Sequence, residues 1–184
     1  IFLVAQKDIE NDDPNYEEVY HMGCLAQIKQ VTKLPENVVR VLVEGIDRAR
    51  LNGFLNKEER YLVSEIEVVK SPLHLNEGRY GRSMEGADIE EEAMIRNLRE
   101  LFLEFCSFFP RMLKHFEGTF SLGVLMDELI ESMPVTFDKK QEVLEAVDLN
   151  TRYQVLAKIL YEEIEVAKIR TELSEQVKAR MEKN

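Results

Sequence analysis

The chain has 184 residues, of which 45% are hydrophobic, and its 24 Lys and Arg against 35 Asp and Glu give a formal charge of −11. This apolar fraction excludes wholesale disorder, and the acidic charge makes nucleic acid an unlikely main ligand through this chain. The longest uncharged apolar run, Ile1–Ala5, is too short to cross a membrane. Two distant cysteines, Cys24 and Cys106, do not make a disulfide framework and suit a reducing compartment.

Alternation of apolar and polar residues with a period of two predicts β-strands in the first third of the chain. We expect strands over Ile1–Ala5, Tyr20–Leu34, Val38–Val43 and Tyr61–Val69, which are rich in β-branched residues. Pro35-Glu36-Asn37 between two of these strands predicts a hairpin whose Asn takes a positive φ. Several short strands joined by turns indicate a small barrel or sandwich.

A change of hydrophobic period divides the chain into a β domain over residues 1–70, a linker over 71–87 and a helical domain over 88–184. The linker holds three of the eight glycines. From Asp88 to Phe109 the apolar residues follow a helical period, and Pro110 marks the end of this helix. Glu90–Glu92 then fall in its first turn, where the helix dipole favours acidic side chains.

Three further helices follow in the sequence. We expect them over about Ser121–Met133 and about Asp138–Val147, with the last running from Asp148, at its N-cap, to Asn184 without Gly or Pro. A helix of that length spans about 54 Å, which is too long for a body of this size to cover throughout.

The distal part of the last helix carries a narrow apolar seam with charged neighbours. Leu173, Val177 and Met181 recur every four residues. This pattern predicts a helix that leaves its domain to meet a partner, so these three are candidate assembly residues. In isolation we expect either fraying beyond about Val166 or self-association through the seam, with the sheet edge beside Ile1–Ala5 as a second route to pairing or swapping.

No motif in the chain carries catalytic, cofactor or metal chemistry. Neither Gly-x-x-x-x-Gly-Lys nor Gly-x-Gly-x-x-Gly occurs, so no phosphate loop is present. His21, His74 and His115 have no second ligand pair at metal-binding spacing. We therefore expect no catalytic residue, no cofactor and no metal site in this chain.

Phenylalanines crowd into one short region after the first predicted helix begins. Most should be core, because aromatic side chains carry much of the buried area of a core. One or two left exposed near residues 110–120 would form an apolar patch suited to gripping unfolded chains, and Phe116 and Phe120 are the candidates for contact with substrate protein. The six residues are Phe102, Phe105, Phe108, Phe109, Phe116 and Phe120.

Several runs of residues are similar to the N-terminal region of bacterial Lon proteases. They occur in the same order along the chain: Ile1–Asp8, Gly23–Pro35, Val39–Arg50, Met133–Glu145 and Val177–Lys183. The hairpin reads Pro-Glu-Asn where the family often has Pro-Asp-Gly, and the family's opening strand and helix are absent before Ile1.

The resemblance implies an α+β protein in which a PUA-like β-barrel or sheet domain precedes an all-α domain that ends in a long helix. It implies a cytoplasmic, homohexameric, ATP-dependent serine protease that uses ATP and Mg and degrades misfolded and regulatory proteins. The family's ATPase module and its Ser–Lys dyad lie beyond the end of this chain, so no catalytic residue is carried over. This chain would be the region that recognises unfolded or damaged proteins and assembles with its own copies.

An alternative reading is a stand-alone PUA-like binding or adaptor module for a small molecule, RNA or one fixed partner. A Gly-rich phosphate loop within about a hundred residues after Asn184 would select the protease reading.

Overall fold

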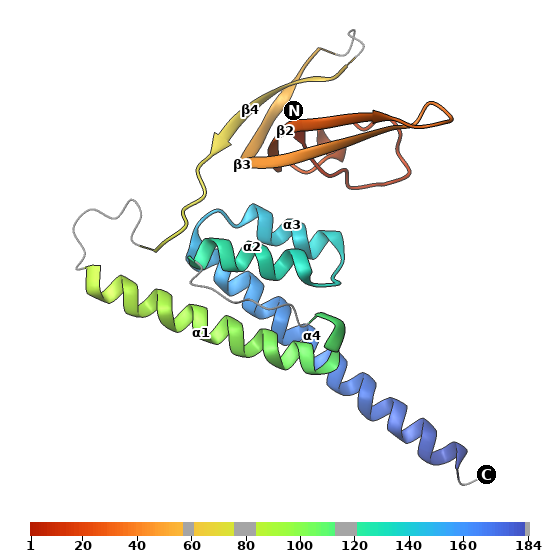
Figure 1. Cartoon of the computed structure of the whole chain (residues 1–184), viewed down its shortest axis with the longest axis vertical. Coiled ribbons are helices and arrows are strands. Elements are labelled where there is room, and N and C mark those ends of the chain that lie inside the picture. The colour runs from red at the N-terminus through yellow and green to blue at the C-terminus, as the bar shows by residue number, and fades with distance from the viewer. Residues whose placement is uncertain (57–60, 76–83, 113–120, 183–184) are drawn as a thin grey trace. The chain divides into compact units, whose positions relative to one another are not determined.

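The computed structural model of the chain describes four stretches of residues: 1–56, 61–75, 84–112 and 121–182. The chain divides into two compact units, Ile1–Ser71 and Pro72–Asn184. Strands make up the first unit and helices the second, with the longest helix last (Figure 1). The α+β class and the order of its two parts are therefore confirmed.

The described strands of the first unit form one antiparallel sheet in the order β1-β2-β3-β4. β3 continues to Asn56, well past the end predicted at Val43. Its pairing with β2 shifts register after Leu25 and again after Ile28, and such bulges disrupt the simple alternation on which the prediction depended. The strands are β1 Phe2–Leu3, β2 Met22–Lys33, β3 Val39–Asn56 and β4 Val63–Val69.

The outer halves of β2 and β3 form a two-stranded ribbon that ends in a tight hairpin (Figure 1). Glu36 and Asn37 both have positive φ, at 63° and 59°, and the amide of Leu34 donates to the carbonyl of Val38 at 2.8 Å. Two successive left-handed residues are the mark of the hairpin turn that matches strand twist. The positive φ predicted for Asn37 is confirmed, and Glu36 shares it.

Four α-helices lie in the described part of the second unit. Ser121 caps α2 by accepting from the amide of Val124, and Asp148 caps α4 by accepting from Asn150 and Thr151. α1 begins four residues before Asp88, so Glu90–Glu92 do not lie in its first turn as expected. The helices are α1 Met84–Phe108, α2 Leu122–Ser132, α3 Phe137–Glu145 and α4 Leu149–Met181.

One continuous apolar core holds the four helices together. α4 contributes Leu156, Ile159, Leu160 and Ile164, while Leu98 of α1 is also fully buried. The last buried residue of α4 is Ala167, and α4 continues past the other helices to the C-terminus (Figure 1). The core therefore fixes only the first part of the long helix.

A buried carboxylate fixes the start of the second unit. Glu91 of α1 is 7% exposed and accepts from the amides of Leu75, at 3.0 Å, and Leu122, at 3.2 Å. Nδ1 of His74 lies 2.9 Å from the same side chain. The stretch around Leu75, which the sequence placed in the linker, is therefore tied to α1 and to the start of α2.

Candidate functional site

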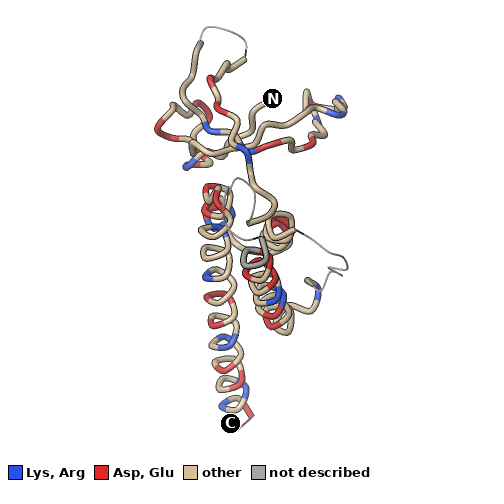
Figure 2. Tube along the Cα trace, turned by 90° about the vertical axis from the view of Figure 1, so that its left-hand side faces the viewer, with Lys and Arg blue, Asp and Glu red and all other residues tan. Residues whose placement is uncertain are grey.

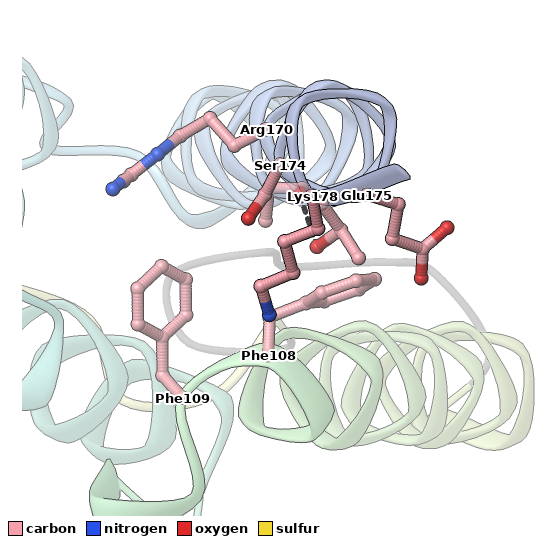
Figure 3. A pocket seen from close by; sticks show the side chains of 8 residues that line it. Phe108, Phe109, Arg170, Ser174, Glu175 and Lys178 are labelled. Atoms are coloured by element: carbon pink, nitrogen blue, oxygen red, sulfur yellow. Dashed lines mark hydrogen bonds between the residues drawn. The ribbon is translucent and has the colours of Figure 1, made fainter. Parts of the chain in front are cut away.

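A groove of about 360 Å³ lies between the C-terminal end of α1 and the second half of α4 (Figure 3). Phe108, the last residue of α1, and Phe109, which follows it, point toward α4, and Ser174 and Lys178 of α4 lie opposite them. This volume falls in the range of pockets that hold small molecules or a few peptide side chains. The lining residues are Phe108, Phe109, Ala167, Arg170, Thr171, Ser174, Glu175 and Lys178.

The aromatic wall of the groove is continuous with the core. Phe105, which is fully buried, stacks on Phe109 with ring centroids 4.7 Å apart, and the ring centroid of Phe102 lies 6.0 Å from that of Phe105. Phe108 and Phe109 are half-buried. The row of rings therefore starts in the core and ends with two accessible aromatic faces.

The opposite wall of the groove is formed by α4. Here the side of α4 that faces the core nearer its start carries polar residues. Ala167, Thr171, Ser174 and Lys178 follow one another at spacings of four, three and four residues, so they lie on one face of the helix. The hydroxyl of Thr171 donates to the carbonyl of Ala167 at 2.9 Å. The apolar face thus becomes hydrophilic just where α1 ends, which leaves a hollow instead of a packed contact.

Lys168 of α4 forms ion pairs with two glutamates, one of which belongs to α1. Nζ of Lys168 on α4 lies 3.0 Å from Glu104 of α1 and 3.1 Å from Glu165 of its own helix. The hydrogen bond to Glu104, followed by that to Glu165, raises the pKa of Lys168 above its ordinary value. The cluster is exposed, so it orients the helices more than it stabilises them.

The groove combines apolar, hydroxyl and charged side chains. Two rings supply apolar area, Thr171 and Ser174 supply hydroxyls, and the charged lining residues are Arg170, Lys178 and the acidic Glu175. In the parts of the chain that the structure describes, no three His, Cys, Asp or Glu side chains group as a metal site. The helices in those parts also lack an apolar stretch long enough to span a membrane. Such a surface suits the mixed side chains of a polypeptide.

The predicted substrate-contact residues, Phe116 and Phe120, lie outside the described residues and stay a prediction. Of the other four phenylalanines, Phe102 and Phe105 are core, while Phe108 and Phe109 reach the groove. The sequence signal that could have found the groove is the polar series on α4 facing the end of an aromatic-rich helix.

The predicted assembly residues lie on an exposed apolar stripe of α4. Leu173, Val177 and Met181 are 55%, 56% and 74% exposed. Val166 and Ile169, at 51% and 54%, extend the row toward the core. These five residues are called the α4 stripe below.

The α4 stripe adjoins the face that packs in the core, since the buried Ile159 lies seven residues before Val166 and only about 20° from it around the helix. Successive residues of an α-helix are rotated by about 100°, which places Ala167 about 100° around the helix from Val166. Leu173 and Val177 stay on the side of Val166, whereas Ser174 and Lys178 stay on the side of Ala167. The groove-lining face and the apolar stripe are therefore neighbouring faces of one helix, and Arg170, which lines the groove, lies about 40° from Val166.

A third apolar surface lies on the β2–β3 ribbon. The register pairs Ile28 with Val43 and Val31 with Val41, and directly paired residues share a face. Ile28, Val31, Val39 and Val41 are between 44% and 56% exposed. This face offers apolar area, but it lacks the converging polar groups of the groove.

Comparison with known proteins places the chain in a family. The model of the ATP-dependent protease La (LON) substrate-binding domain matches residues 1–162. The Lon proteases of Lachnoclostridium phytofermentans and Clostridioides difficile are 36% and 32% identical to the whole chain, which covers 22% and 23% of their lengths. A solved N-terminal domain of a Mycobacterium avium complex Lon protease is 19% identical, with a TM-score of 0.49 over 87% of this chain and 77% of that one.

The chain thus spans less than a quarter of the curated relatives it matches. Because the family model covers most of its length, this protein belongs to the family of Lon substrate-binding domains.

Proposed function

We propose that this chain is the substrate-recognition and assembly region of an ATP-dependent Lon-type serine protease, and that it binds polypeptide without catalysing its cleavage. The groove between α1 and α4 carries this proposal. Its two rings suit apolar side chains of an unfolded protein, and its Arg170, Lys178 and Glu175 offer partners for charged ones. The matching family model is named for substrate binding.

The proposed partners are unfolded or damaged proteins and other copies of the same chain. In the parent protease these copies would form a cytoplasmic homohexamer, with the α4 stripe available as a contact. Polypeptide recognition by apolar area without deep pockets gives weak and broad binding, as suits a protein that captures many clients.

ATP and Mg would act in other parts of the parent protease. The chain contains no phosphate-loop motif, and its described carboxylates do not gather into a metal site, so its residues do not fit a nucleotide–magnesium complex. What this chain contributes is capture of the client and contact between copies.

Fluorescence anisotropy with a reduced and alkylated, unfolded client tests this function, with the native form of the same client for comparison. Ser174→Trp fills the groove at a solvent-exposed position, and Phe108→Ser removes one of its rings. We expect each to weaken binding of the unfolded client at least fivefold. Leu103→Ser, which changes an exposed apolar residue of α1 that does not line the groove, is the matched control.

Equal affinity for native and unfolded client would refute the proposed function. If both groove variants still bind the unfolded client more tightly than the native one, the binding surface lies outside the groove. Circular dichroism of each variant shows whether the helical unit is retained.

A further inference from the structure

We propose that the outer edge of β3 pairs with the same edge of a second copy in antiparallel orientation; this rests on the assembly role proposed above. The edge comprises residues 39–45 and is called the β3 edge below. β2 pairs with one side of this part of the strand, and β4 pairs with the other side only from Arg48 onward. The backbone groups of the β3 edge that point away from β2 therefore have no neighbouring strand among the described residues.

The two long edges of the ribbon differ in regularity. On β2 the register skips Lys29, which is the extra residue of a bulge, and a bulge that carries a lysine hinders edge-to-edge pairing. The β3 edge has an unbroken register over all seven of its residues, up to the bulge at Ile46. A regular open edge of this length is a template for a further strand, so β3 is the edge that can accept one.

The charges of the β3 edge are arranged symmetrically about Leu42. Arg40 lies two residues before it and Glu44 two residues after it. In an antiparallel pair with the two Leu42 residues opposite each other, Arg40 of each copy lies opposite Glu44 of the other, and such unlike pairs stabilise neighbouring strands. A parallel pair in register would place like charges opposite each other. The charge pattern therefore favours the antiparallel pair.

The same pairing brings valine side chains together on the other face of the sheet. Directly opposite residues share a face, so Val41 of one copy meets Val43 of the other. In the single copy Val41 is 44% exposed and Val43 is half-buried. Ile28 and Val31 of β2 lie on this face as well, so pairing would join the apolar faces of two ribbons into one surface.

Charge complementarity selects a second copy as the occupant. Arg40 is exposed and forms no ion pair with a residue that the structure describes. Glu44 pairs with Lys29 of its own ribbon, but its side chain is 61% exposed and can accept a second cation. An arbitrary unfolded segment has no fixed charges at this spacing, whereas a second copy presents both at once. Basic and acidic residues are interspersed over the sheet unit (Figure 2), so these local pairs decide the contact.

Charge reversal at the β3 edge tests the pairing in the full chain. Arg40→Glu places two carboxylates opposite each other and Glu44→Arg places two guanidinium groups opposite each other, so each variant alone should dimerise at least tenfold more weakly than wild type in sedimentation experiments at millimolar concentration. An equimolar mixture of the two variants restores unlike pairs and should dimerise at least tenfold more tightly than either alone. Lys33→Glu changes the net charge as Arg40→Glu does, but it lies on β2 and is the matched control.

A single cysteine at the centre of the β3 edge tests the register. Leu42→Cys lies opposite itself in the proposed pair, whereas Val39→Cys lies opposite Gly45 and about 20 Å from its own counterpart. The background is Cys24→Ser, because Cys106 is 1% exposed and burial raises the pKa of its thiol, which keeps it unreactive. We expect a yield of disulfide-linked dimer at least tenfold higher for Leu42→Cys than for Val39→Cys.

Several outcomes would overturn the proposal. A wild-type chain that stays monomeric at millimolar concentration would do so, as would dimers that Arg40→Glu leaves unchanged. A mixture of the two charge variants that dimerises no better than each alone would exclude the antiparallel pair. If no dimer forms and Arg40→Glu instead weakens binding of the unfolded client, the β3 edge accepts a client strand and the proposal is wrong.

The same variants separate this inference from the proposed function. Arg40→Glu and Glu44→Arg leave the groove residues unchanged, so binding of the unfolded client should persist while dimers are lost. Loss of client binding in Ser174→Trp with dimers retained would show the converse. Each proposal can therefore fail alone.

Discussion

Nε of Arg152, in the first turn of α4, donates to the carbonyl oxygen of Ala146 at 2.8 Å from a fully buried position. Nη2 donates to the carbonyl of Val147 at 2.9 Å, and Nη1 lies 3.6 Å from Asp127 of α2. The last turn of α3 contains no basic residue of its own. One side chain of α4 therefore supplies positive charge to the end of α3 and reaches α2 as well.

Arg152→Ala is expected to lower the free energy of unfolding of the helical unit by about 3 kcal/mol, because it leaves buried carbonyl groups without a donor. Asp127→Asn should cost less than about 1 kcal/mol, since the Asp127 side chain is half exposed. Urea denaturation followed by circular dichroism measures both. Equal effects of the two variants would contradict the dominant role given to the carbonyl contacts.

Glu91→Ala is expected to cost about 2 kcal/mol, because the amides of Leu75 and Leu122 lose a buried acceptor. Hydrogen exchange at these two amides should accelerate more than exchange in the middle of α4. Glu91→Gln keeps one acceptor oxygen and should fall between wild type and Glu91→Ala. Unchanged exchange at Leu75 in both variants would show that the carboxylate does not hold this stretch.

Asp148 makes part of the free energy of unfolding depend on pH in the acidic range. Its hydrogen bond to the Thr151 side chain, then that to the Thr151 amide, lowers the pKa of Asp148 below its ordinary value. A carboxylate with a lowered folded pKa contributes fully above its unfolded value of about 3.9, and that contribution is lost as pH falls through the folded pKa.

Asp148→Ala should therefore cost about 1 kcal/mol at neutral pH, and the difference from wild type should shrink as pH falls below about 4. Asp148→Asn, which keeps an N-cap acceptor, should lose the acid dependence that Asp148 adds while retaining most of the stability. The pKa of Asp138 is also lowered, first by its hydrogen bond to the Thr136 side chain, but this group is common to all three proteins. Parallel slopes below pH 4 in wild type and Asp148→Asn would exclude the linkage.

Phe116→Ser and Phe120→Ser test the substrate-contact residues predicted from the sequence. If these side chains are accessible, each variant should keep its helical content and bind the unfolded client several-fold more weakly, because apolar contact area is lost. The affinity of each variant for the native form of the client is the reference value. Unchanged affinity in folded variants would leave the groove rings as the aromatic contacts.

The starts of two helices could be predicted from the sequence because capping residues mark them. Ser121 and Asp148 each stand directly before a helical run and cap it in the structure. β3 was predicted too short because its pairing with β2 passes through a bulge at Ile46, beyond which Ala49 and Leu51 alternate again as buried residues. The caps thus identified the starts of α2 and α4, whereas α1 begins four residues before its predicted start and tertiary pairing extends β3.

The buried role of Glu91 and the position of the groove could not be predicted. Nothing in Glu90–Glu92 distinguishes the middle carboxylate until α1, α2 and the stretch around Leu75 come together. The groove likewise depends on α1 ending at Phe108 beside a point on α4 far away in the sequence. The stripe on α4 was predictable because it involves one helix alone.

The 33 residues of α4 contain neither Gly nor Pro, so the helix has no built-in hinge along about 50 Å. Its first part is clamped in the core as far as Ala167, and the remaining 14 residues, Lys168–Met181, form an arm of about 21 Å. A tilt of about 10° at the groove would displace the tip of this arm by about 4 Å. A ligand in the groove that changed the angle of α4 would therefore also move the exposed end of this helix.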